Sequence, residues 1–403
     1  MRTPLQAFVA LTLVAVTGLV GLTPQAAKAV CRNEVKGQQI PDTANWPQQI
    51  WDLTMLPGNA RGTGIKVAVL DSGVDANHPQ LQSRLAAAPR DLLQSLNVHE
   101  DCVGHGTGVA GIIAARPVKG TNFRGLAPDA TILSARVSES TGGQQQGNDK
   151  PVSPDQVADA VDWAVANGAK VINISFVYHT DVDLRRFKAS IDAAIKQGVV
   201  VVAAVGNDFE NNNPTPYPAA WDGVVGVAAI QYDGFQRMPQ SGLGEFVDIS
   251  APGVNVPTTA PKEGLQSVSG TSYAAPFVSA TAALIFDRYS DQNITGDQVI
   301  KRLLATADPA PGGRSSKGYG VGIVNPIRAV TDVLDDLPPQ AAEPLPAPHT
   351  DPVALNQAKR MEERKQLAWW LSGIGIVAGI LALALMLALP AGIRRRWRPA
   401  GRA

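Results

Sequence analysis

The sequence predicts an α/β fold in which helices cover both faces of a mostly parallel sheet. Three observations support it. The body of the 403-residue chain alternates short apolar runs with helical patterns. The runs are rich in β-branched residues and apolar throughout, as strands buried on both faces are. One helical pattern carries signals at both of its ends. Strands alternating with helices favour parallel pairing, with functional groups at the strands' carboxyl ends.

Residues 1–29 have the layout of a secretory signal peptide. A charge at Arg2 precedes an apolar run from Leu5 to Leu22, and the segment closes on Ala27-x-Ala29. We expect cleavage after Ala29. An uncleaved N-terminal anchor is the alternative, and either one directs the body of the protein to export. Residues 30–42 are then an N-terminal extension that leads into the body.

The body, residues 43–335, supplies the sheet and its helices. The helix before residue 169 is the best signalled: Ser153 is the expected N-cap, Pro154 the first residue, Gln156 the partner in a capping box, and Gly168 the terminator. The predicted strands are the run that ends at Asp71 and residues 129–137, 169–175, 198–206 and 223–230.

The C-terminal part predicts a stalk, one membrane span and a basic tail. Residues 336–368 include six prolines between Pro338 and Pro352, which favour an extended linker. Trp369 to Leu389 is a 21-residue stretch without a charge, enough to cross a hydrocarbon core of about 30 Å; a buried core helix is the alternative. Residues 390–403 carry five arginines and no acid. A basic tail stays in the cytoplasm, so the body faces outward.

The overall charge excludes an obvious nucleic-acid partner. Lys plus Arg and Asp plus Glu both number 35, so the formal net charge is zero. A nucleic-acid surface would need a basic excess.

Three polar residues stand where strands and helices meet. Asp71 ends its strand, His105 lies between glycines at the start of a helical pattern, and Ser272 precedes the apolar pattern "YAAPFVSATAALIF". A serine hydroxyl needs a base to take its proton, and a histidine oriented by a buried carboxylate is suited to this. Taken singly, each residue has a structural alternative, because Asp and Ser cap turns and helices and His fills polar core sites.

The motifs around these residues resemble those of the subtilisin-like serine proteases. "VAVLDSGVD", "HGTGVAG" and "SGTSYAAP" match the three active-site motifs in the family's order, with "GLAP" (125–128) and "VINIS" (171–175) in support. The resemblance covers most of residues 43–335 and implies a three-layer subtilisin-like fold. It assigns Asp71, His105 and Ser272 to the catalytic triad, with Ser272 rather than Ser269 as nucleophile. Asn207, after Gly206, is the implied oxyanion donor.

The resemblance also places substrate binding after the strand that ends in "VINIS". It implies Ser175 and Phe176 as substrate-binding residues. The glycines usual in that segment of the family are replaced here by Phe176, Val177 and Tyr178. Primary specificity is therefore not transferable from the family. The polar loop 138–153 either borders this cleft or is a flexible surface loop.

The two cysteines, Cys31 and Cys102, predict a disulfide, because an even pair in an exported chain favours one. Free thiols and a lipid on Cys31 are the alternatives, although Val30 does not fit a lipoprotein cleavage site. The remaining histidines, His78, His99, His179 and His349, are expected to be non-catalytic. No Cys or His spacing suggests zinc, and we expect no metal or other cofactor.

The full layout is similar to that of the mycosins, membrane-anchored subtilases of type VII secretion. It implies a single-pass membrane endopeptidase that cleaves polypeptides outside the membrane and belongs to a secretion complex. About 40 residues between Ala29 and Asp71 leave no room for the family's usual propeptide beside the first strand. A mainly structural role in that complex, with proteolysis secondary, is the alternative function.

Overall fold

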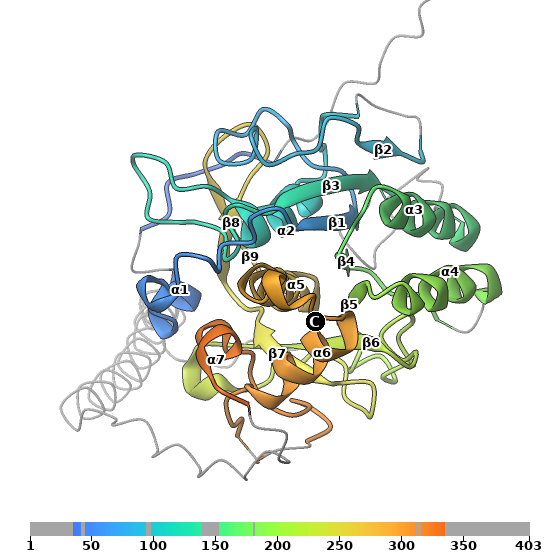
Figure 1. Ribbon diagram of the computed structural model, residues 1–403. Coiled ribbons are helices and arrows are strands. Elements are labelled where there is room, and N and C mark those ends of the chain that lie inside the picture. Colours follow the sequence, from blue (N-terminus) through green and yellow to red (C-terminus); the bar gives the residue numbers. More distant parts are fainter. Residues whose placement is uncertain are drawn as a thin grey trace, which may run out of the picture. The chain divides into compact units, whose positions relative to one another are not determined.

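Seven strands form one parallel sheet in the computed structural model, in the order β2-β3-β1-β4-β5-β6-β7 (Figure 1). The structure describes residues 35–41, 45–93, 98–138, 153–179, 182–311, 313 and 316–334. The strands of this sheet are β1 (Lys66–Asp71), β2 (Arg90–Asp91), β3 (Thr131–Arg136), β4 (Val171–Ile174), β5 (Val200–Ala204), β6 (Val224–Ile230) and β7 (Ile249–Pro252). A separate antiparallel hairpin consists of β8 (Val256–Thr259) and β9 (Leu265–Val268).

Helices cover both faces of the sheet, which makes three layers. The α-helices are α1 (Trp46–Ile50), α2 (His105–Ala114), α3 (Pro154–Ala166), α4 (Arg185–Lys196), α5 (Thr271–Arg288), α6 (Gly296–Ala305) and α7 (Pro326–Thr331). Short 3₁₀ turns are η2 (Leu53–Met55), η3 (Asp233–Phe235) and η4 (Ser290–Gln292).

Each face of the sheet has its own hydrophobic core, because successive side chains of a strand point to opposite faces. In β1, Val67 and Val69 enter the core beneath α2, α5, α6 and α7, whereas Ala68 and Leu70 enter the core beneath α3 and α4. All four side chains are fully buried. Strands buried on both faces explain why the sequence shows continuous apolar runs instead of alternation.

The five predicted strands correspond to β1, β3, β4, β5 and β6, which confirms the mostly parallel sheet. The predicted helix is α3, and its capping box is present. Ser153 Oγ accepts the Gln156 N–H at 3.3 Å, and Gln156 Oε1 accepts the Ser153 N–H at 3.1 Å. The sequence analysis did not predict β2, β7 or the β8–β9 hairpin. These strands are short, and all four contain proline or polar residues.

The helix α5 lies buried between the sheet and the helices α2, α6 and α7. It packs against β4, β5, β6 and β7 and against α2, and its residues 271–286 are all buried. Many of them are Ala, Ser or Thr, which lets the helix backbone approach the sheet closely. The first turn of α5 therefore lies at the carboxyl edge of the sheet, beside the start of α2.

Part of the predicted N-terminal extension joins the hairpin. Gln38 pairs with Leu265 of β9 through two backbone hydrogen bonds, with N···O distances of 2.8 and 2.9 Å. The predicted signal peptide, stalk, membrane span and basic tail lie outside the described residues. Within those residues, no helix combines the length and apolar character that crossing a membrane requires.

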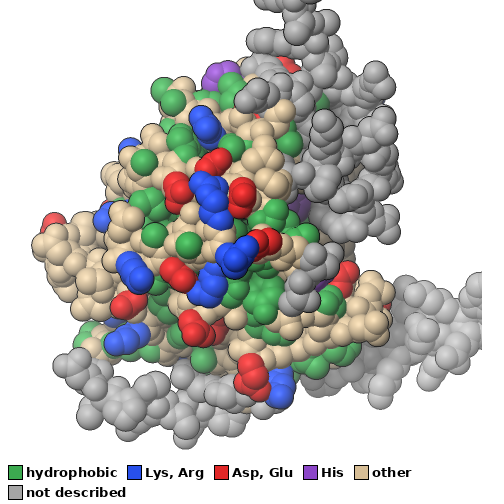
Figure 2. Space-filling view, turned by 90° about the vertical axis from the view of Figure 1, so that its right-hand side faces the viewer, with side chains coloured by type: hydrophobic (Ala, Val, Ile, Leu, Met, Phe, Trp, Pro, Cys, Tyr) green, Lys and Arg blue, Asp and Glu red, His purple; other side chains and the backbone are tan. Residues whose placement is uncertain are grey.

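The face that carries α3 and α4 mixes charges of both signs (Figure 2). Its ion pairs include Arg185 with Asp183, Arg186 with Asp159, and Lys188 with Asp192. A mixed surface of this kind has no field of a single sign that would attract a polyanion.

Candidate active site

Asp71 and His105 meet at the carboxyl edge of the sheet. Asp71 is the last residue of β1, and His105 is the first of α2. His105 Nδ1 lies 2.7 Å from Asp71 Oδ1, and the two residues are 5% and 4% exposed. The same carboxylate oxygen accepts the Ser72 N–H at 2.7 Å. Because a carboxylate can only accept, the imidazole has to carry its proton on Nδ1, which leaves Nε2 as a base.

The electrostatic setting raises the pKa of His105. Burial is the largest influence and by itself lowers this pKa. The negative charge of Asp71, its hydrogen bond and the charge of Asp101 act in the opposite direction and prevail, so the pKa of His105 lies above its ordinary value. The site thus favours the imidazolium that forms when the histidine accepts a proton.

A second buried acid, Asp101, holds the His105 loop in place. Its Oδ1 accepts the Ser72 hydroxyl at 2.9 Å and the N–H groups of Val103 and Gly104 at 3.1 and 2.8 Å. Its Oδ2 accepts the N–H and the hydroxyl of Thr107 at 2.8 and 2.6 Å. Burial raises the pKa of Asp101, and the nearby Asp71 charge adds to the effect although the hydrogen bonds oppose it.

Ser72 links the two acids. Its hydroxyl donates to Asp101 and accepts the Gly106 N–H at 2.9 Å. The turn after Asp71 is therefore bonded to the first turn of α2. The role of Asp101 was not predicted from the sequence, although an acid four residues before His105 in the same loop could have indicated it.

Arg136, the last residue of β3, is a buried guanidinium behind this arrangement. It is 1% exposed. Its Nε donates to the Ser72 carbonyl at 3.2 Å, its Nη1 to Asp91 at 3.2 Å, and its Nη2 to the Glu100 carbonyl. Arg136 thereby ties the segment after Asp71 to the segment before Asp101. This role of Arg136 was not predicted from the sequence, because a cation at a strand end resembles an ordinary surface residue.

Ser272 is the second residue of α5. Its hydroxyl donates to the Ser175 carbonyl at 2.9 Å, and the structure has no hydrogen bond between it and His105. The next side chain, Tyr273, packs against the His105 ring at a tilt of 49°, with 4.9 Å between ring centroids. Asp71 and His105 are thus in direct contact, and Ser272 lies next to a residue that touches His105.

A proline in α5 explains the bonds around Ser272. Pro276 has no N–H, so the carbonyl of Ser272, four residues earlier, lacks its usual helical donor. The Ser175 hydroxyl supplies that donor at 2.8 Å. Ser175 in turn accepts from the Asn173 amide at 2.9 Å, and the Asn173 oxygen accepts the Ser279 hydroxyl at 2.8 Å. This buried network fixes the first turn of α5 against β4.

Asn207 follows β5 and meets the start of α5. Its Oδ1 accepts the N–H and the hydroxyl of Thr271 at 3.0 and 3.1 Å. A backbone N–H can only donate, so the facing atom is the amide oxygen and the NH₂ group points elsewhere. Within the described part of the chain, neither this NH₂ group nor the Ser272 N–H has a hydrogen-bond acceptor.

Gly270 shows that the two donors converge. At φ +145° it precedes α5 as an N-cap without a side chain, and Asn207 supplies the missing cap. A Cβ at Gly270 would lie 3.4 Å from Asn207 Nδ2 and 3.9 Å from Ser272 N. Both N–H groups therefore border one small volume next to the Ser272 hydroxyl, where an anionic oxygen could accept from both.

The contacts of Ser269, His78 and His179 distinguish them from Ser272 and His105. Ser269 is exposed, and its hydroxyl accepts the Asn255 N–H at 2.9 Å, which is a turn contact. His78 is buried and its Nε2 lies 3.0 Å from the Gly264 carbonyl; burial lowers its pKa. His179 lies 3.9 Å from Asp208 at the surface. Within the described ranges, no group of His, Cys, Asp and Glu could hold a metal ion.

Of the two predicted substrate-binding residues, Ser175 contacts Ser272 directly and Phe176 does not. Phe176 turns the other way and packs edge-on against Tyr178, with 5.8 Å between ring centroids. Cys102 lies in the loop before His105, whereas Cys31, His349 and nearly all of the loop 138–153 fall outside the described residues. The Cys31–Cys102 disulfide stays a prediction.

Comparisons with known proteins agree with the motifs. Residues 62–322 match the Subtilase family. Subtilisin E of Bacillus subtilis is 34% identical over 266 residues, which cover 66% of this chain and 65% of that protein, so the chain spans about two thirds of that relative. Mycosin-1 of Mycobacterium tuberculosis is 34% identical over 345 residues, covering 73% of this chain and 75% of its own.

Solved structures of related proteins have a similar fold. MycP1 from the ESX-1 type VII secretion system superposes with a TM-score of 0.64 at 29% identity, over 77% of this chain and 92% of that one. MycP3 protease from the type VII (ESX-3) secretion system gives a TM-score of 0.62 at 31% identity, over 75% and 93%.

Proposed function

The chain belongs to the subtilase family, and from this premise we propose that it is a serine endopeptidase that cleaves polypeptides through Ser272, His105 and Asp71. Its similarity to mycosins supports the mycosin group within that family. The observation that carries the proposal is the buried Asp71–His105 hydrogen bond, which adjoins the first turn of α5.

Each group in the site has a step in the reaction. The Ser272 hydroxyl leaves the Ser175 carbonyl and turns to His105 Nε2, a rearrangement of the kind that active sites make when substrate binds. His105 takes the proton as the Ser272 oxygen attacks the scissile carbonyl carbon. Asp71 keeps the other ring proton on Nδ1 and stabilises the imidazolium.

The carbonyl oxygen becomes anionic in this step and accepts hydrogen bonds from Asn207 Nδ2 and Ser272 N. His105 then gives its proton to the leaving amine, and the acyl group stays on Ser272. A water molecule then attacks the acyl carbon while His105 takes its proton. The bond between the acyl carbon and Ser272 Oγ breaks, His105 returns the proton to Ser272 Oγ, and the acyl fragment leaves as a carboxylic acid.

A fluorophosphonate probe tests this assignment, because it labels only an activated serine. We expect the wild-type chain to be labelled and Ser272→Ala to be unlabelled, with peptide hydrolysis reduced about 10⁶-fold, a magnitude known from a subtilisin. Ser269→Ala is the matched control, because it removes a serine from the same motif that contacts only a turn. Equal labelling of wild type and Ser272→Ala would disprove the proposal.

We further propose that the catalytic body is exported and anchored by the span Trp369–Leu389, with residues 390–403 in the cytoplasm. The signal peptide, the uncharged stretch and the basic tail support this. The full chain should stay with membranes during alkaline extraction, and a chain without residues 369–403 should not. Extraction of the full chain into the soluble fraction would contradict the anchor.

A structural role in a type VII secretion complex is the second candidate function. It is favoured by the similarity to MycP1 and MycP3, which come from such systems. The decisive comparison is secretion in a strain with Ser272→Ala against a deletion strain. Secretion retained only in the point mutant would establish the structural role, and equal loss in both would remove its support.

A further inference from the structure

The segment after β4 presents its side chains alternately to two sides. Ser175 points to Ser272, as its hydrogen bonds show. Phe176 and Tyr178 lie on the opposite side and begin a series of aromatic contacts. The ring centroids of Tyr178 and Phe187 are 5.9 Å apart, and those of Phe187 and Trp221 are 5.1 Å apart. In an extended segment the residue two after Ser175 faces the same way as Ser175. Val177 therefore faces the side of Ser272.

Val177 lies directly over Gly206. A Cβ placed on Gly206 would be 3.5 Å from both γ-carbons of Val177, which is ordinary van der Waals contact. Gly206 has φ +80° and immediately precedes Asn207. The isopropyl group of Val177 thus occupies the space between the segment after β4 and the loop that carries the oxyanion donor.

The proposed reaction fixes where the substrate must lie. The scissile carbonyl carbon sits within reach of Ser272 Oγ, with its oxygen between Asn207 Nδ2 and Ser272 N. The residue that contributes this carbonyl, here called the acyl-side residue, has its Cβ only two bonds away from that carbon. Its side chain consequently starts next to the wall formed by Ser175, Val177 and Gly206.

We infer that Val177 restricts the acyl-side residue to small side chains, namely Gly, Ala and Ser. This inference rests on the proposed endopeptidase function and names the substrate class of that site. A Leu or Phe side chain would have to occupy volume that the Val177 methyl groups already fill. In a chain with glycine at position 177, the same space would be open.

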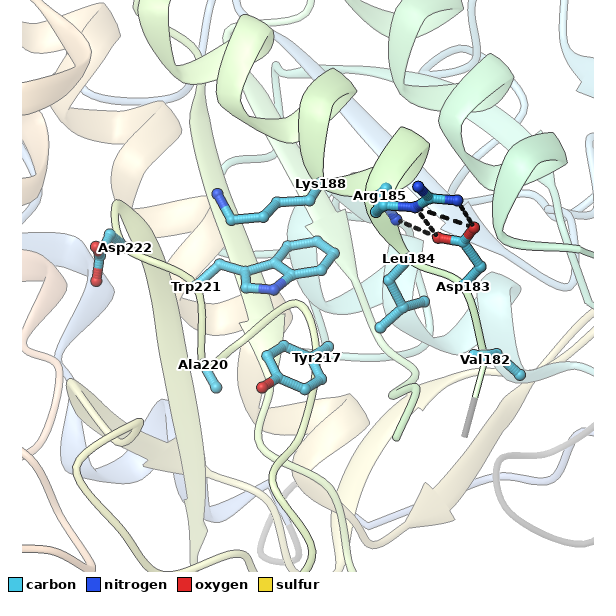
Figure 3. A pocket seen from close by; sticks show the side chains of 9 residues that line it. All are labelled: Val182, Asp183, Leu184, Arg185, Lys188, Tyr217, Ala220, Trp221 and Asp222. Atoms are coloured by element: carbon cyan, nitrogen blue, oxygen red, sulfur yellow. Dashed lines mark hydrogen bonds and ion pairs between the residues drawn. The ribbon is translucent and has the colours of Figure 1, made fainter. Parts of the chain in front are cut away.

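The groove in Figure 3 does not offer an alternative for that side chain. It has a volume of about 580 Å³ and lies at the start of α4, with Tyr217, Trp221 and the Asp183–Arg185 ion pair in its lining. None of Ser272, Asn207 and Val177 is among its lining residues. Its lining residue Trp221 ends the aromatic series that begins at Phe176, on the side of the segment opposite Ser175.

Matched peptides that differ only at the acyl-side residue test the inference on the purified full chain. The wild-type chain should cleave the Ala peptide with a higher kcat/KM than the Leu and Phe peptides. Val177→Ala should raise the Leu-to-Ala and Phe-to-Ala ratios of kcat/KM by about 10- to 100-fold, because a single methylene in an apolar site already discriminates by about 10- to 200-fold. Val182→Ala, a valine of the Figure 3 groove, should leave the ratios unchanged.

The outcomes separate the inference from the function on which it rests. Cleavage of Phe and Ala peptides at equal rates by the wild-type chain, or unchanged ratios in Val177→Ala, would overturn the inference and leave the endopeptidase intact. No cleavage of any peptide, together with no fluorophosphonate labelling of Ser272, would overturn the endopeptidase and the inference with it. A thermal unfolding midpoint of Val177→Ala close to that of wild type shows that a changed ratio reflects the site.

Discussion

The two sides of the first turn of α5 are built differently. The acid–base side consists of Asp71, Ser72, Asp101, His105 and Arg136. All five are at most 5% exposed, and each is bonded to at least one other element or loop. The acyl side consists of Ser175, Val177, Gly206 and Asn207, of which Val177 is only half-buried and Asn207 is exposed.

Under the proposed function, this difference separates the residues that carry out the reaction from those that select the substrate. On the acid–base side, moving one group would strain several hydrogen bonds, because Asp101 alone accepts five. On the acyl side, Val177 has an apolar side chain that takes part in no hydrogen bond. A substitution there can alter which residue fits without disturbing proton transfer. Substitutions on the two sides should therefore have distinguishable consequences.

Of the substitutions on the two sides, those at Asn207 should have the largest effect, because Asn207 caps α5 and also carries the proposed oxyanion donor. Asn207→Ala removes both the oxyanion donor and the cap of α5. Asn207→Asp keeps the oxygen that accepts from Thr271 but removes the NH₂ donor. We expect kcat to fall about 10²- to 10³-fold in both variants, the effect known for an oxyanion asparagine in a subtilisin. The measurement is steady-state hydrolysis of the Ala peptide.

Stability then separates the two functions of Asn207. Asn207→Ala should lose about 1 kcal/mol of unfolding free energy with the helix cap, whereas Asn207→Asp should retain it. If Asn207→Asp kept wild-type kcat, the amide would serve only as a cap, and the acyl side would have no oxyanion donor besides Ser272 N.

Asp101→Asn tests the acid–base side and should act mainly through stability. An amide offers one acceptor oxygen, so its NH₂ group would face either the Thr107 donors or the Ser72, Val103 and Gly104 donors. A buried donor left unsatisfied costs about 1–3 kcal/mol, and we expect the variant to lose about 3 kcal/mol of unfolding free energy. Urea unfolding at pH 7 measures it.

Asp52→Asn is the matched control for Asp101. Asp52 accepts the N–H and hydroxyl of Thr54, as Asp101 accepts those of Thr107, but it lies at the surface. Water can satisfy the donors there, so the change in stability should be far smaller. Equal losses in the two variants would show that burial does not distinguish Asp101.

The sequence predicted the parts of this site that depend on local pattern. Continuous β-branched runs identified β1 and β3 to β6. The motifs pointed to Asp71, His105 and Ser272, which lie at the end of β1 and in the first turns of α2 and α5. Composition alone could not separate Ser272 from Ser269, whose different contacts arise only from the fold.

Residues whose roles depend on distant partners could not be predicted from the sequence. Arg136 is buried because Ser72, Asp91 and Glu100 converge on it from three other segments, and no local pattern records that. The cap that Asn207 provides to α5 joins positions 64 residues apart. Likewise, Val177 was recognised as a departure from the family's glycine, but only its contact with Gly206 shows which space it fills.

The pH dependence gives the smallest expected effect and ties the acid–base side to activity. His105 acts as a base only when neutral, and its pKa is raised. The kcat/KM should therefore increase with pH through a midpoint above the ordinary histidine pKa of about 6.5. Stability should change in the opposite sense. A raised folded-state pKa means that protonated His105 contributes stability below about pH 6.5, and this contribution is lost as the pH rises through the raised pKa.

Asp71→Asn removes the charge that raises the pKa of His105, while burial continues to lower it. The residual activity of that variant should therefore have its midpoint at lower pH than that of the wild type. Val177→Ala, on the acyl side, should keep the wild-type midpoint. A midpoint that moved with Val177→Ala and not with Asp71→Asn would reverse the division between the two sides.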